Sequence, residues 1–172
     1  MAVYALGKRV PTIADTAYIH PDAVVIGSVT IGDYSSVWPS TVLRGDYGEI
    51  SVGDRTSVQD GAVIHATHDL ATRIGSDCVI GHNAHLEGCT VEDKSLVGSG
   101  AIVLHRAIVH SGGLVGAGAV VSGGTEVPSG AMALGIPAKI KPDAVTPGLI
   151  EIAVAVYIEN AKRYPKELRR ID

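Results

Sequence analysis

Four side chains that can bind a divalent metal occur within a short part of the sequence: His65, His82, His85 and Glu87. Imidazole and carboxylate groups suit zinc and other first-row divalent metals, and three protein ligands leave a coordination position open for water. Water held at such a metal loses a proton near neutral pH and becomes a nucleophile. The four residues therefore predict a catalytic metal centre; the alternative is a group of solvated surface histidines.

An aliphatic residue recurs at every sixth position through most of the chain, beginning at Ile19. A period of six suits neither an α-helix nor an ordinary pleated strand. It is the signature of a hexapeptide β-solenoid, in which short strands stack coil upon coil. Insertions at 44–49 and about 66–73 interrupt the count. We therefore predict an all-β solenoid domain over residues 1–140.

The repeat also predicts which side chains share a face. Three hexads form one coil, and neighbouring coils lie about 4.8 Å apart. Arg44, His65 and Glu87 each follow one of three stacked interior residues, so they fall in one exterior column. His85 points outward as well, whereas His82 lies nearer a corner of its coil. We therefore expect a neighbouring subunit to supply His82, as three-fold packing of prisms would allow.

Polar residues near this column could assist the chemistry. Arg44 and Asp46 could form an ion pair that fixes a subunit interface and tunes the field at the site. Gln59, followed by Asp60, could orient a metal-bound water by a hydrogen bond. Ordinary interface polarity is the alternative reading of these residues.

A different pattern follows the repeat over residues 141–172. Apolar residues recur there at helical spacing, with Thr146 as a possible cap before Pro147 and with Pro165 expected to kink or end the helix near Tyr164. A helix laid along the flank of a solenoid buries apolar surface. We predict that this C-terminal helix packs on the solenoid.

Composition excludes several classes of partner. The net charge of −4 and the pI of about 5.9 argue against nucleic acid and anionic membranes. No apolar run is long enough to span a bilayer, and the N-terminus has no signal-peptide core. The two cysteines form no disulfide framework. These features favour a cytoplasmic protein.

The chain resembles the γ-class carbonic anhydrases over nearly its whole length. The resemblance implies a left-handed parallel β-helix and a homotrimer with a metal, Zn²⁺ or alternatively Fe²⁺ or Co²⁺, at each subunit interface. The implied activity is that of a lyase, the reversible hydration of CO₂ to bicarbonate by a metal-bound hydroxide. The matching segments are 43–46, 59–61, 64–65, 80–82, 88–91 and 135–139.

The resemblance also implies roles for individual positions. The three metal ligands of the family map onto His65, His82 and Glu87, with position 82 donated by the neighbouring subunit. The interface pair maps onto Arg44 and Asp46, the water-orienting Gln and the Asp after it onto Gln59 and Asp60, and a tyrosine that approaches the site onto Tyr164.

Two positions depart from the family pattern. Glu87 stands where the family has His, and Ser57 where it has Asn. Three alternatives follow: Glu87 binds the metal directly, His85 takes its place, or the site is weakened. Two other functions remain open: an acyltransferase or thioesterase acting on acyl-CoA, and a non-catalytic trimer that binds a metal or small ligand.

Overall fold

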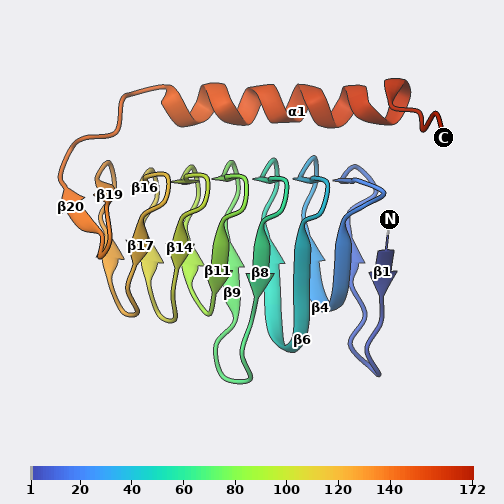
Figure 1. The fold of residues 1–172 in the computed structure, drawn as a ribbon, viewed down its shortest axis with the longest axis horizontal. Coiled ribbons are helices and arrows are strands. Elements are labelled where there is room, and N and C mark those ends of the chain that lie inside the picture. Colours follow the sequence, from blue (N-terminus) through green and yellow to red (C-terminus); the bar gives the residue numbers. More distant parts are fainter. Residues whose placement is uncertain (1) are drawn as a thin grey trace.

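Short parallel strands stack in successive coils to form a left-handed β-helix, and one long helix lies along its flank (Figure 1). The computed structural model describes residues 2–172; Met1, part of the expected solenoid domain, lies outside the described residues. The strands are β1 (Ala2–Tyr4), β2 (Thr12–Ile13), β3 (Tyr18–Ile19), β4 (Val24–Ile31), β5 (Ser36–Val37), β6 (Val42–Val52), β7 (Ser57–Val58), β8 (Val63–His65), β9 (Thr72–Ile74), β10 (Val79–Ile80), β11 (His85–Glu87), β12 (Thr90–Val91), β13 (Leu96–Val97), β14 (Ile102–Val103), β15 (Ile108–Val109), β16 (Leu114–Val115), β17 (Val120–Val121), β18 (Glu126–Val127), β19 (Met132–Leu134) and β20 (Lys139–Lys141).

The strands form three flat faces. One face is a separate sheet in the order β20-β19-β16-β13-β10-β7-β5-β3. The other two faces are joined into a single sheet because the long strands β4 and β6 each continue round a corner. The first insertion, at 44–49, is thus part of a strand, since all of it lies within β6. We call the face that contains β8, β11, β14 and β17 the second face.

The six-residue period places one aliphatic side chain in the interior at each step. Leu43, Ile64 and Leu86 are 0% exposed and pair in register from coil to coil, as the repeat predicts. Glycine is required where coils approach most closely: a Cβ at Gly53 would lie 2.6 Å from the carbonyl carbon of Gly75. The core is thus a narrow column of aliphatic residues, which explains why the chain contains no Phe.

The C-terminal helix α1 (Leu149–Glu167) packs against β3, β5, β7 and β10 of the separate sheet. Ile150 and Val154 are buried on its inner side, in one cluster with Val79. Among residues 2–172, no helix combines the length and the apolar character needed to span a membrane.

The expected cap at Thr146 was wrong, and the helix does not end near Tyr164. Gly148, with φ of 80°, is the N-cap, and Thr146 makes no side-chain cap. At the other end, the helix continues through Pro165. Proline removes only one backbone N–H in this last turn, while the Tyr164 ring packs edge-on against Trp38, 4.9 Å between centroids, and holds the turn to the solenoid.

Candidate metal centre

The second face carries the predicted exterior column of polar residues. Arg44 at one level pairs in register with His65 of β8, which pairs in turn with Glu87 of β11. This prediction is confirmed. The short spacing between stacked strands therefore places a guanidinium, an imidazole and a carboxylate on one surface in three successive coils.

Hydrogen bonds connect this column into a chain in which basic and acidic side chains alternate. Glu87 Oε1 lies 2.7 Å from His65 Nδ1, and Asp46 Oδ1 lies 3.0 Å from His65 Nε2. Arg44 donates to the other carboxylate oxygen of Asp46. The side chains of His65, Asp46 and Glu87 are 14%, 18% and 23% exposed, so these contacts are only partly screened by solvent.

Both carboxylates of the column are held in the ionised form. Hydrogen bonding to His65 lowers the pKa of Glu87 and outweighs the opposing effect of desolvation. Desolvation acts to raise the pKa of Asp46, but the combined hydrogen bonds from Arg44 and His65 bring the net pKa below its ordinary value. The surface is therefore anionic next to His65, as a cation site requires.

Two further imidazoles face the Glu87 carboxylate. Glu87 Oε2 lies 3.6 Å from His85 Nε2 and 3.8 Å from His105 Nε2. The ligands predicted from the sequence do not include His105. The signal that could have found it is the length of one coil: Leu86 pairs with Val103, which puts His105 level with Gly88, beside Glu87.

His82 lies at the corner between β10 and β11, with its side chain 46% exposed. Asp60 Oδ2 lies 2.9 Å from His82 Nδ1. The opposite ring nitrogen, Nε2, is 3.5 Å from the Tyr157 hydroxyl. A carboxylate that holds one imidazole nitrogen and leaves the other for a metal is the usual support of a histidine ligand.

The remaining candidates lie beside this corner. Gln59 directly precedes Asp60 and is 4% exposed. Tyr164 packs against Trp38 and Tyr18, and the helix tyrosine that reaches His82 is Tyr157, which the sequence did not predict. Its hydroxyl would have been found by counting two helical turns back from Tyr164.

The donor types fit a divalent metal, but the donors of one chain do not suffice. Within residues 2–172, no group of three or more His, Cys, Asp and Glu side chains is arranged to hold a metal ion. His65 is the last residue of β8 and Glu87 the last residue of β11, whereas His82 lies at the corner between β10 and β11. Imidazole and carboxylate are donor types that bind zinc and similar divalent metals, so the residues present fit such a metal.

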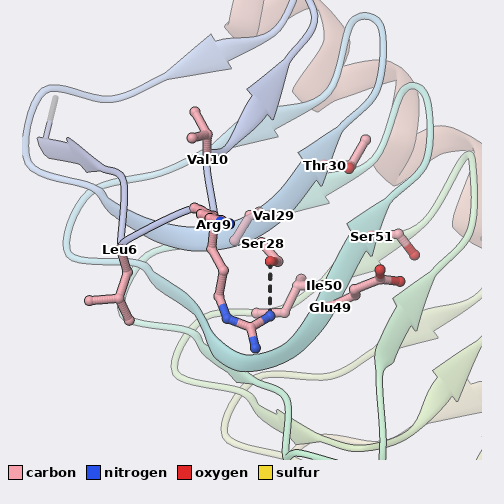
Figure 2. A pocket seen from close by; sticks show the side chains of 10 residues that line it. Leu6, Arg9, Val10, Ser28, Val29, Thr30, Glu49, Ile50 and Ser51 are labelled. Carbon is pink, nitrogen blue, oxygen red and sulfur yellow. Dashed lines mark hydrogen bonds between the residues drawn. The ribbon is translucent and has the colours of Figure 1, made fainter.

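A large cavity lies elsewhere, under the N-terminal segment (Figure 2). Its volume is about 650 Å³, and Arg9 spans it toward Ser28, with 3.4 Å between Nη1 and Oγ. Its other walls include Glu49 and Ser51 of β6. None of the candidate metal ligands lines this cavity, so it is separate from the column.

Comparison with known proteins places the chain in a family. Residues 11–45 match the family model described as bacterial transferase hexapeptide (six repeats). The chain is 45% identical to a probable carbonic anhydrase of Methanocaldococcus jannaschii over 90% of this chain and 94% of that protein. It is 44% identical to the mitochondrial γ-carbonic anhydrase 1 of Arabidopsis thaliana over 56% of this chain, which spans only 37% of that protein. The chain belongs to the γ-carbonic-anhydrase-like family.

This γ-carbonic-anhydrase-like protein also matches a transferase-type structure. The crystal structure of a hexapeptide transferase family protein from Anaplasma phagocytophilum superposes with a TM-score of 0.90 at 34% identity, covering 95% of this chain and 98% of that one. The β-helix with its flanking helix is therefore shared by proteins named for two different chemistries, and the site residues must distinguish them.

Proposed function

We propose that this protein is a metal-dependent carbonic anhydrase that hydrates CO₂ reversibly to bicarbonate, with one site between each pair of subunits in a homotrimer. The observation that carries the proposal is the division of the ligand set. His65 and Glu87 are joined at 2.7 Å on the second face, while His82 stands at a corner with one nitrogen held by Asp60. A second copy brings its own His82 to the His65–Glu87 pair.

An apolar stripe beside the site supports association of copies. Six outward-facing residues pair in register along the second face, and five of them are aliphatic. Val63 is one of these aliphatic residues and is 39% exposed, although burial of its apolar side chain against another surface would be favourable. The stripe consists of Val24, Val42, Val63, His85, Ile102 and Val120. A second copy packed on this stripe would bury it and close the metal site.

The chain's own residues then have separate tasks. Zn²⁺, or alternatively Fe²⁺ or Co²⁺, would supply a Lewis acid that lets water ionise near neutral pH. Asp60 fixes the orientation and tautomer of His82. Arg44 compensates the charge of Asp46, which in turn holds His65. The Gln59 amide, next to Asp60, donates or accepts a hydrogen bond that orients the attacking water.

The proposal is tested by metal content and CO₂ hydration, measured on the wild type and on His82→Ala. We expect about one metal per chain in the wild type, and loss of both metal and hydration in the variant. His68→Ala is the matched control, because His68 is 82% exposed in a loop and its ion-pair partner is the neighbouring Asp69. Full metal content in His82→Ala would contradict a site that depends on the corner histidine.

Acyl transfer from a CoA thioester is the second candidate function. It is favoured by the transferase family model over 11–45 and by the superposition on the Anaplasma protein. The two candidates differ in their need for metal. Release of free CoA from acetyl-CoA in the presence of a chelator, without CO₂ hydration by the metal-loaded protein, would favour acyl transfer.

A further inference from the structure

His105 lies next to the proposed site with its polar atom unsatisfied. Its Nε2 is buried and has no hydrogen-bond partner among residues 2–172. A buried polar atom without a partner costs free energy and in a native protein indicates a missing partner. The acidic group that faces it is Glu87, whose Oε2 is 3.8 Å away, too far for a hydrogen bond.

The backbone holds the His105 ring in this position. Arg106 N donates to the Gly88 carbonyl at 2.7 Å, and Gly124 N donates to the His105 carbonyl at 3.0 Å. Gly88 leaves room for the ring, because a Cβ there would lie 2.8 Å from His105 Cδ2. The ring is therefore directed toward Glu87 by the coils on both sides.

The spacing between the two side chains suits two ligands of one metal. Zinc binds nitrogen and oxygen at about 2.0–2.2 Å, so two such ligands lie about 3.4 Å apart in a tetrahedral site and at most about 4.3 Å apart. The 3.8 Å between His105 Nε2 and Glu87 Oε2 falls within this range. A cation between Nε2 and the carboxylate would supply the partner that this buried nitrogen lacks.

We propose that His105 is a further ligand of the metal site, binding through Nε2 beside Glu87. The inference rests on the proposed function for the presence of a metal, and it adds a residue from a third successive coil to the ligand set. It also gives Glu87 a function as the ligand that joins His65 in one coil to His105 in the next.

The test is binding of Zn²⁺ and Co²⁺ alone to the full chain. Affinity is measured by competition with a chromophoric chelator, and the ligand field by the visible absorption of the Co²⁺ form. We expect His105→Gln to weaken both metals at least about tenfold and to change the Co²⁺ spectrum. His105→Asn is the second variant, in case the longer side chain disturbs folding over Gly88. His68→Gln is the matched control and should bind like the wild type.

Each result decides between the two proposals. Wild-type affinity and an unchanged spectrum in both His105 variants would overturn the inference, while loss of metal in His82→Ala would leave the proposed function standing. Weaker binding with an unchanged Co²⁺ spectrum would also overturn direct ligation. Weaker binding in His105→Gln but not in His82→Ala would support His105 and contradict the site between subunits. A wild type that binds neither metal would overturn both.

Discussion

At the scale of single residues, Glu87 is the acidic group that faces three histidines. One carboxylate faces imidazoles from three coils, at 2.7 Å from His65, 3.6 Å from His85 and 3.8 Å from His105. Because of these contacts, we expect a substitution at Glu87 to change the stability of the metal-free protein. This stability can be measured without an activity assay.

Glu87→Gln should lower the free energy of unfolding of the metal-free protein by about 1–3 kcal/mol at pH 7, because it weakens a charge-assisted hydrogen bond. The pKa of Glu87 is lowered in the folded state, so its contribution is present above the unfolded pKa of about 4.3 and is lost as the pH falls through the folded pKa. Urea unfolding at pH 7 and pH 3 should show the difference shrinking at pH 3. Asp69→Asn, at an 89% exposed position, is the control; an equal loss there would refute the prediction.

His110 should give stability with the opposite pH dependence. Its Nε2 lies 2.9 Å from Glu126, Glu92 lies 3.3 Å from Nδ1, and the pKa of His110 is raised, first by the hydrogen bond to Glu126. A raised pKa contributes stability that is complete below the unfolded pKa of about 6.5 and disappears as pH rises through the folded pKa. His110→Asn should therefore cost more stability at pH 5.5 than at pH 8.5, by chemical denaturation. A cost that is equal at the two pH values would contradict this.

At the scale of elements, helix α1 offers a matched pair of substitutions. Ile150 is 3% exposed and packs on Val79, whereas Ile152 is 69% exposed. Ile150→Ala should destabilise the protein by about 2–3 kcal/mol, and Ile152→Ala by less than about 0.5 kcal/mol. Urea unfolding and the rate of proteolysis within the helix are the measurements. Similar effects of the two variants would mean that the helix is not held through its inner side.

Strands and helix differed in how well the sequence predicted them. The interior residues of the strands follow directly from the six-residue period, because each coil repeats the same environment. The helix ends do not follow from the sequence pattern, because they depend on tertiary contacts. Tyr164 packs on Trp38, and this contact keeps the chain helical beyond Pro165. Helix propensity alone does not predict that this tertiary contact outweighs the one hydrogen bond lost at Pro165.

The part of the candidate site that depends on strand register could be predicted from the sequence. The contacts that depend on side-chain orientation could not. Arg44, His65 and Glu87 share a column because their strands pair in register. His105 was not predicted because it stacks over Gly88. The absence of a side chain at Gly88 lets the His105 ring turn toward Glu87. A contact of this kind does not recur with the six-residue period, so the repeat in the sequence does not reveal it.

At the scale of the whole molecule, the apolar stripe on the second face makes assembly testable. Val63→Asp should leave the fold of one chain intact, because the side chain is 39% exposed, but should oppose packing of another copy. Light scattering should show a smaller mass than that of the proposed wild-type trimer, and metal analysis should show less metal than in the wild type. Thr30→Asp, at an exposed position on a different face, is the control. A wild-type mass for Val63→Asp would place the subunit contact elsewhere.

Each coil of the β-helix is hydrogen-bonded only to the coil before it and the coil after it. Stability in such a stack spreads from neighbour to neighbour. His65, Glu87 and His105 come from three adjacent levels in the middle of the stack, so fraying at either end leaves their relative positions unchanged. The terminal coils can therefore unfold first, and the arrangement of these three side chains is lost only when unfolding reaches the middle of the stack.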